Sequence, residues 1–198
     1  MFRAWVLLMI VSIVAGCAPA KFEIVPAGDR FSDPSITGIV GKNNRLSTRS
    51  TQGGVHVDAS GVYLDPFIHQ DRSTGTILSA GFYVLHFNTS VDSGFAPIEE
   101  VIFLVNGVDR IVAQVTDYDS NFKVLSWNSI GKTYNTTFNE SGVALMRADE
   151  FARVASASVL EVKITGGKRS HIYEAKDLVP GFAENLHTFA LAAGMTDR

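Results

Sequence analysis

The histidines are the residues with the most versatile chemistry in this sequence, and their spacing matches no recognised site. There are five of them: His56, His69, His86, His171 and His187. No pair forms the His-Glu-x-x-His motif that binds zinc. His56 and Asp58 would share one face of a strand and His86 would lie on the polar face of another, so a metal or acid–base pair requires these strands to be neighbours. We therefore predict no catalytic residue and no metal site.

Signatures of nucleophilic, nucleotide-binding and calcium sites are incomplete. The sequence has no Gly-x-Ser-x-Gly motif. Residues 166–170 (GGKRS) have Val162 where a P-loop needs its first glycine, and they lie between two expected strands. Residues 117–121 begin like a calcium loop, but Phe122 stands in place of glycine and Asn128 in place of glutamate. We interpret the two segments as a hairpin turn and a solvated turn, and we expect no cofactor.

Cys17 is the only cysteine, and it follows a segment with the features of a secretory signal. Arg3 supplies a positive charge, and residues 4–14 are apolar apart from Ser12. This run is too short to span a bilayer comfortably, which takes about 20 apolar residues. A single cysteine also cannot form an intramolecular disulfide or a thiolate zinc site. Two interpretations of this segment give Cys17 no role: an uncleaved membrane anchor, and an ordinary secretory signal in which the cysteine is incidental.

The sequence Val14-Ala15-Gly16-Cys17 resembles the lipobox of bacterial lipoproteins, which is an aliphatic residue, two small residues and an obligatory cysteine. This resemblance covers only the first 17 residues. It implies diacylglyceryl transfer to the Cys17 thiol, cleavage between Gly16 and Cys17, and acylation of the new amino group, detectable as palmitate. Stable anchoring to a membrane takes two membrane-binding groups, such as two acyl chains, and this modification would supply three acyl chains. Ala18 rather than aspartate follows Cys17, which resembles the pattern sorted to the outer membrane of double-membraned bacteria.

Composition and length favour one folded, exported domain. The 198 residues are 46% hydrophobic and 19% charged, with a net charge of −3. These values argue against disorder, and the acidic balance argues against a nucleic-acid partner. We expect a signal peptide at residues 1–16, the lipidated Cys17 with a tether or lead-in through residue 51, and a single domain over residues 52–198.

Alternating apolar residues predict a strand-rich first part of this domain. Asn106-Gly107 lies between two apolar β-branched runs and predicts a hairpin, since both turn residues must accept positive φ. Further strands are expected at residues 36–40, 55–58, 62–64, 81–88, 122–127 and 132–138, with a turn at residues 117–121.

The last sixty residues predict a different order of elements. A helix is expected over residues 146–157, followed by strands at residues 159–165 and 170–174. A final helix, capped by Asp177 and with Pro180 in its first turn, should reach residue 193 and bury Leu178, Phe182, Leu186 and Phe189. The predicted class is α+β: an antiparallel sheet or sandwich followed by a C-terminal helix–strand–strand–helix segment.

These patterns predict a non-catalytic binding or assembly module, held on the inner leaflet of the outer membrane and facing the periplasm. Its partners would be the membrane, through the N-terminal lipid, and a protein of the cell envelope. One alternative is a carrier of a small ligand or lipid in an apolar cavity between sheet and helices. Another is a hydrolase in which His56, His69 or His86 meets a carboxylate or serine in a concave site.

Overall fold

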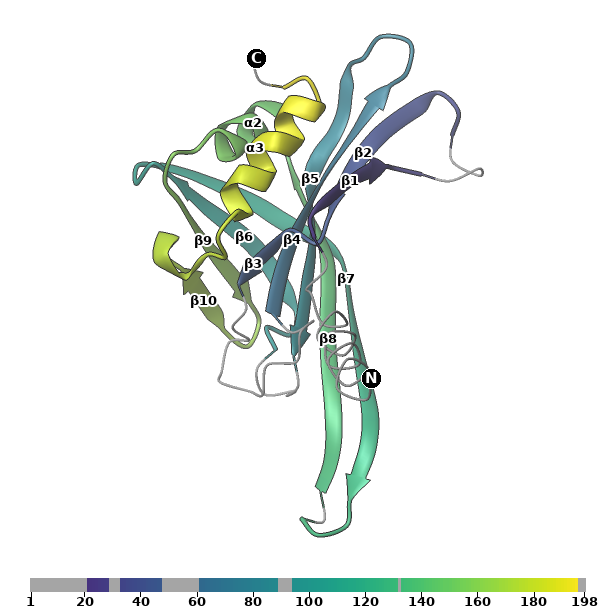
Figure 1. The fold of residues 1–198 in the computed structure, drawn as a ribbon, viewed down its shortest axis with the longest axis vertical. Coiled ribbons are helices and arrows are strands. Elements are labelled where there is room, and N and C mark those ends of the chain that lie inside the picture. Colours follow the sequence, from purple (N-terminus) through teal and green to yellow (C-terminus); the bar gives the residue numbers. More distant parts are fainter. Residues whose placement is uncertain (1–20, 29–32, 48–60, 89–93, 132, 196–198) are drawn as a thin grey trace, which may run out of the picture.

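The protein is built on one antiparallel sheet, shown in Figure 1. The computed structural model describes residues 21–28, 33–47, 61–88, 94–131 and 133–195. Within them, strands run in the order β1-β2-β4-β5-β8-β7-β6-β9-β10, and β3 pairs with β4. Their bounds are β1 Glu23–Pro26, β2 Ile36–Lys42, β3 Arg45–Ser47, β4 Gly61–Asp71, β5 Ile77–Asn88, β6 Ile98–Val105, β7 Asp109–Asn128, β8 Thr133–Met146, β9 Leu160–Gly166 and β10 Ser170–Tyr173.

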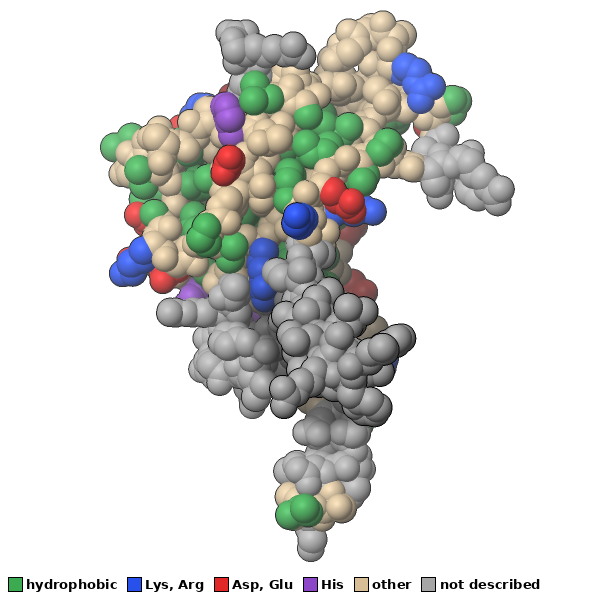
Figure 2. Space-filling model, viewed as in Figure 1, with side chains coloured by type: hydrophobic (Ala, Val, Ile, Leu, Met, Phe, Trp, Pro, Cys, Tyr) green, Lys and Arg blue, Asp and Glu red, His purple; other side chains and the backbone are tan. Residues whose placement is uncertain are grey.

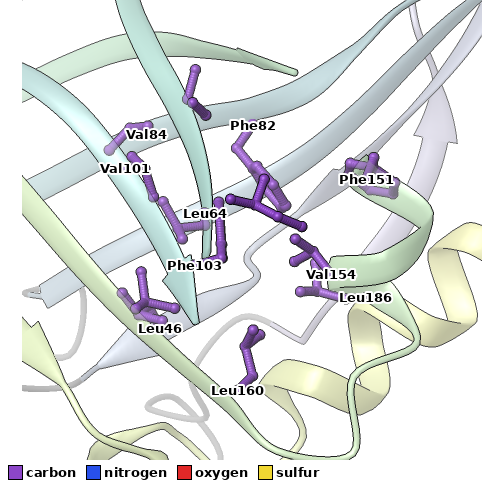
Figure 3. Packing of buried hydrophobic residues seen from close by; sticks show 14 of the residues in the cluster. Leu46, Leu64, Phe82, Val84, Val101, Phe103, Phe151, Val154, Leu160 and Leu186 are labelled. Carbon is purple, nitrogen blue, oxygen red and sulfur yellow. The ribbon is translucent and has the colours of Figure 1, made fainter. Parts of the chain in front are cut away.

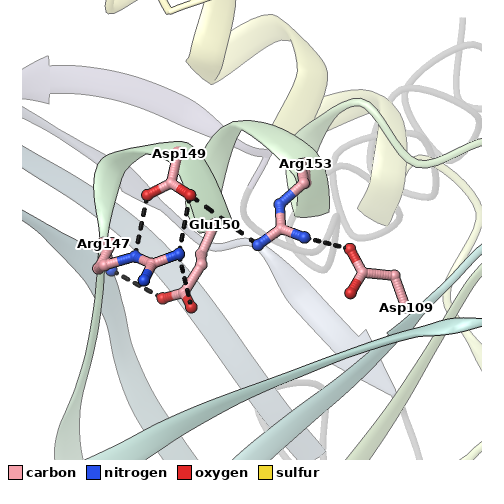
Figure 4. Close-up of polar contacts among 5 residues, drawn as sticks. All are labelled: Asp109, Arg147, Asp149, Glu150 and Arg153. Carbon is pink, nitrogen blue, oxygen red and sulfur yellow. Dashed lines mark hydrogen bonds and ion pairs between the residues drawn. The ribbon is translucent and has the colours of Figure 1, made fainter.

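Two helices, α2 (Ala148–Ala155) and α3 (Phe182–Ala192), pack together on one face of this sheet. The Glu150 carboxylate accepts the Arg147 backbone N–H at 3.1 Å, which satisfies a donor at the start of α2. Arg147 also pairs with Asp149, and Arg153 pairs with Asp109 at the start of β7 (Figure 4). The Arg153–Asp109 pair ties the polar side of α2 to the sheet, whereas the apolar residues Phe151, Val154 and Ala155 of α2 are buried in the core. The architecture is therefore α+β.

The core lies between the sheet and the two helices (Figure 3). Side chains alternate between the two faces of a strand, so Phe82 and Val84 of β5 point into this core together. The Phe82 ring centroid lies 5.2 Å from that of Phe103 on β6 and 5.3 Å from that of Phe151 on α2. Phe151 in turn lies 5.9 Å from Phe189 on α3. A continuous row of aromatic rings thus joins the sheet to both helices.

The structure confirms the Asn106-Gly107 hairpin. Asn106 and Gly107 have φ values of 52° and 75°, and the turn joins β6 to β7. The Asn106 side chain has a further role, because its Oδ1 accepts the backbone N–H groups of Ser158 and Val159. The turn therefore also fixes the connection between α2 and β9.

The predicted turn at residues 117–121 is wrong, because β7 runs through it. The strand keeps pairing with β8 across a register irregularity between Thr116 and Asp119, where Asp117 has a φ of 51°. This is the geometry of a β-bulge. The polar residues of this stretch are largely exposed, so the strand needs no apolar alternation there.

The predicted tether over residues 17–51 is also corrected in part, because β1, β2 and β3 belong to the sheet. The strand expected at residues 36–40 is confirmed as part of β2, which contains Gly38 and Gly41. A Cβ on Gly38 would lie 2.4 Å from the Ile68 carbonyl oxygen, and one on Gly41 would lie 2.6 Å from the Phe22 ring. These glycines permit close packing. The domain therefore begins before residue 52, a boundary that itself lies outside the described residues.

The final helix begins later than predicted. Asp177 belongs to a short 3₁₀ turn, η2 (Ala175–Asp177), and α3 starts at Phe182 after Gly181, whose φ is 90°. Pro180 therefore precedes the helix and does not lie in its first turn. Leu178 lies outside the helix and is half-buried, whereas Phe182, Leu186 and Phe189 are buried as predicted.

The β7–β8 hairpin continues beyond the body of the sheet as an arm, which we define as residues 122–131 and 133–138. Pairing of β6 with β7 reaches Gln114, and pairing of β5 with β8 reaches Phe138. Past these positions, β7 and β8 pair only with each other within the described residues. Figure 1 shows the arm projecting well away from the rest of the molecule.

Candidate functional site

The face of the sheet opposite the helices contains a groove of about 660 Å³. The register places Asp65, Tyr83 and Val143 in one row across β4, β5 and β8, with Leu85 and Ser141 in the next row. The odd-numbered residues of β5 face this side because the even-numbered Phe82 and Val84 face the core. The groove is lined by Val25, Pro26, Ala27, Gly28, Val40, Lys42, Asn43, Asp65, Tyr83, Leu85, Asp117, Ser141, Gly142 and Val143.

Asp65 is the most perturbed charged group of the groove. Asp65 is only 7% exposed, and this burial raises the pKa of its carboxyl group to about 6. Hydrogen bonds from the backbone of Asn44 and Asn43 act in the opposite direction but are outweighed. The Asn44 N–H donates to Oδ1 at 2.7 Å. Lys42 lies near enough to oppose the shift of the pKa. A buried, ionisable acceptor in an otherwise largely apolar groove suits a ligand that brings a hydrogen-bond donor or a positive charge.

Aromatic rings cluster around this groove. Phe67 and Tyr83 have ring centroids 4.8 Å apart, and Phe67 also lies 5.4 Å from the His69 ring. Tyr63 and Phe87 meet edge to face at 5.8 Å. Of these rings, Tyr83 lines the groove and Phe67 packs against it, so one side of the groove is aromatic.

A second hollow of about 280 Å³ adjoins the groove and shares Ala27 and Gly28 with it. His69 and Ser79, on neighbouring strands, both line it, and His69 Nδ1 lies 3.0 Å from Ser79 Oγ. The hydrolase alternative requires a histidine and a serine within hydrogen-bond distance in a concave site, and His69 and Ser79 are that close. A nucleophile–base pair also needs a third group that orients the base. Among the described residues, no carboxylate is within hydrogen-bond distance of His69, so the arrangement lacks that group.

The sequence predicts His86 on the polar face of a strand, and this prediction is wrong. His86 is fully buried on β5, opposite Glu140 of β8, and its Nδ1 lies 2.9 Å from Glu140 Oε2. Its ring also packs 5.1 Å from that of Phe95. His86 is buried because it follows Phe82 and Val84 on the same alternating set of β5, and Glu140 supplies its polar partner there. The pair is sealed from solvent and opens to neither hollow.

Glu140 is the hub of this buried cluster. Its Oε2 accepts the Phe95 N–H at 2.8 Å, and its Oε1 accepts the Ala96 N–H at 2.7 Å and the Tyr118 hydroxyl at 3.0 Å. Burial opposes ionisation, but the hydrogen bonds from His86, Ala96 and Phe95 outweigh it and lower the pKa of Glu140. Burial, with the nearby carboxylate, raises the pKa of Tyr118 to about 12. The cluster joins β5, β7, β8 and the segment before β6, which is a structural role.

The other histidines are dispersed. His171 lies on β10 with its ring 4.6 Å from that of Tyr173, and His187 is exposed on α3. His56 and Asp58 lie outside the described residues, as do Gly16 and Cys17 of the lipobox. Within the part of the chain that the structure describes, no cluster of three or more potential ligands could hold a metal ion.

The groove residues were not anticipated from the sequence. One signal was present, however, since residues 82–85 are apolar on both alternating faces although the helices can cover only one. Such a strand indicates a second surface that is partly buried or binds something.

No helix of the described residues is long and apolar enough to cross a membrane. No family of known proteins matches the chain, and no curated protein or solved structure matches it either.

Proposed function

We propose that this protein is a membrane-anchored lipoprotein of the bacterial cell envelope that acts as a non-catalytic binding module. Lipid on Cys17 would hold it on the inner leaflet of the outer membrane, facing the periplasm, as the lipobox and Ala18 imply. The tether would keep the groove at a high local concentration near an envelope partner.

One observation carries the binding role: the sheet has two apolar faces, and the helices cover only one. The covered face is filled by core side chains such as Phe82, Phe103 and Phe151. The other face keeps a groove with apolar walls formed by Tyr83 and Leu85 and an acidic group, Asp65, below them. Apolar walls around a few placed polar groups are typical of binding sites.

The proposed partner is an envelope protein that presents an extended segment to the groove. Aliphatic side chains of that segment would contact Tyr83 and Leu85, and a basic or amide donor would reach Asp65. The acidic character of the chain, which has 20 acidic and 17 basic side chains, favours the same choice.

Site-specific photocrosslinking in intact cells tests this proposal. A photoreactive residue at position 85 should give a discrete protein adduct, whereas one at Val108, which is 85% exposed in the β6–β7 turn, should give none. Val143→Arg would fill the groove and should abolish the adduct, with circular dichroism verifying that the variant folds. Equal adducts at both positions, or an adduct that survives Val143→Arg in a folded protein, would contradict the proposal.

A ligand carrier is the second candidate, favoured by the groove volume of about 660 Å³. This volume falls within the range of roughly 300–1,000 Å³ that is typical of small-molecule sites. The space between sheet and helices is occupied by core side chains, so a carrier would use the groove instead. Native mass spectrometry of protein purified from envelopes distinguishes the two candidates, because a carrier should retain a ligand mass that Val143→Arg removes.

A further inference from the structure

The arm is a two-stranded ribbon without support from the rest of the sheet. Beyond the Phe122–Phe138 pair, neither β7 nor β8 has a second neighbouring strand within the described residues. An isolated two-stranded hairpin is marginally stable in water. A surface that contacts the arm would compensate for this missing support.

Large apolar side chains are exposed along the arm. Phe122 is 53% exposed, Val124 is 50% exposed and Ile130, in the turn at its end, is 96% exposed. Figure 2 shows hydrophobic atoms at the far end of the arm. Single exposed apolar residues are common on soluble proteins, but three within nine positions of a projecting hairpin indicate a contact surface.

The charge of the arm differs from that of the rest of the chain. The arm contains the exposed Lys123 and no aspartate or glutamate, in a chain with an acidic excess. Trp127 and Tyr134 occupy paired positions in the β7–β8 register. Tryptophan and tyrosine are enriched where proteins meet the lipid headgroup region, and lysine is attracted to anionic headgroups.

The root of the arm lies close to the start of the described chain. Val25 and Pro26 of β1 line the same groove as Asp117 and Ser141 at that root. Only four residues lead from Cys17 to Lys21, so an extended chain spans at most about 14 Å. A lipid on Cys17 would therefore keep the arm near a bilayer; this step rests on the proposed function.

We propose that the arm docks on the surface of an anionic phospholipid bilayer, with Phe122 and Val124, which share one face of β7, in the headgroup region. Lys123 lies on the opposite face, so it attracts the anionic surface at a distance and does not contact the lipid phosphates. The arm would then be a second membrane contact besides the lipid, and it would fix the direction in which the groove faces.

Tryptophan fluorescence tests this docking directly. Trp5 lies in the predicted signal peptide, so Trp127 in the arm is the only tryptophan of the mature chain. A mature chain with Cys17→Ser, which has no lipid, is mixed with vesicles that contain phosphatidylglycerol or only phosphatidylcholine. The emission should shift to the blue, and brominated lipid should quench it, only with phosphatidylglycerol vesicles. Because the lipid is absent, this result is independent of whether Cys17 is acylated in cells.

Matched variants locate the contact. Ile130→Ser should weaken the apparent vesicle affinity about tenfold. Val108→Ser, in the turn of the other hairpin, should leave it unchanged. Lys123→Gln should weaken it only about twofold, because Lys123 lies on the face away from the bilayer, roughly one Debye length from the phosphates, and Lys168→Gln, in the exposed β9–β10 turn, should leave it unchanged.

Three results would overturn the proposal. The first is unchanged Trp127 emission with phosphatidylglycerol vesicles, and the second is equal loss of affinity in the Ile130 and Val108 variants. The third is a concentration-dependent dimer, seen by analytical ultracentrifugation, that Ile130→Ser dissociates, because the arm would then bind a second copy of the chain.

Discussion

Replacing Glu140 with glutamine perturbs the best-connected polar group of the core. The wild-type carboxylate accepts hydrogen bonds on both oxygens, with the Phe95 N–H on one and the Ala96 N–H on the other. A glutamine has only one acceptor oxygen. Whichever way its amide is turned, its NH₂ group therefore faces a backbone N–H that loses its partner.

The expected cost follows from these contacts. A buried donor left without an acceptor costs about 1–3 kcal/mol, and a hydrogen bond to a charged group, such as the one that the Glu140 carboxylate accepts from His86, contributes about 1.5–3 kcal/mol. We therefore expect Glu140→Gln to lower the free energy of unfolding by about 3–5 kcal/mol at pH 7. The pKa of Glu140 is lowered in the folded state, so the ionised group stabilises the protein above the unfolded pKa. The deficit of the variant should shrink as the pH falls through the folded pKa.

Urea denaturation followed by far-ultraviolet circular dichroism measures this effect. With a slope of about 2 kcal/mol per molar urea, the midpoint should fall by about 2 M. Glu100→Gln is the matched control, because Glu100 accepts one exposed cross-strand hydrogen bond from Gln114 at 2.8 Å. This control should change stability by less than about 0.5 kcal/mol. A loss below about 1 kcal/mol for Glu140→Gln would refute the reasoning.

Three further predictions concern other parts of the fold. Burial raises the pKa of Asp65 to about 6, so its ionisation should lower the free energy of unfolding as the pH rises from about 4 to 6. Asp65→Asn should flatten this dependence of stability on pH, measured by urea titrations at each pH. An unchanged dependence in the variant would contradict the raised pKa. Phe151→Ala should cost about 3–5 kcal/mol in the same assay, because it removes the α2 ring that packs between Phe82 of the sheet and Phe189 of α3. A cost near 1 kcal/mol would mean that the core is poorly packed there. A double-mutant cycle on Arg153 and Asp109 should give a coupling of only about 0.2–1 kcal/mol, since both side chains are partly exposed, and a coupling above about 2 kcal/mol would contradict this.

Local chemistry made some elements predictable from the sequence. A two-residue hairpin turn needs a positive φ at both of its residues, and Asn106 and Gly107 tolerate this conformation. Their presence between two apolar runs therefore located the β6–β7 turn. The helix around Phe151 and Val154 was predictable for a similar reason, because buried residues at helical spacing leave a pattern that strands do not.

Other features depended on contacts that are distant in sequence. The role of the glycines in β2 could not be read from the sequence, because Gly38 and Gly41 make room for Ile68 and Phe22, which approach closely from other segments. His86 looked like a surface residue until its partner Glu140, 54 positions later, was brought opposite it by pairing of β5 with β8. The groove was unpredictable for the same reason, since its residues come from β1, β2, β4, β5, β7 and β8.

Mass spectrometry of the N-terminal tryptic peptide tests the lipid anchor most directly. Protein is purified from the envelopes of cells that express the full chain, and trypsin cleaves after Lys21. If Cys17 carries the lipid anchor, the peptide begins at Cys17, with a diacylglyceryl thioether on its sulfur and an acylated amino group. A peptide that begins at Ala4 and carries a free Cys17 thiol, or a chain cleaved at another residue, would contradict it.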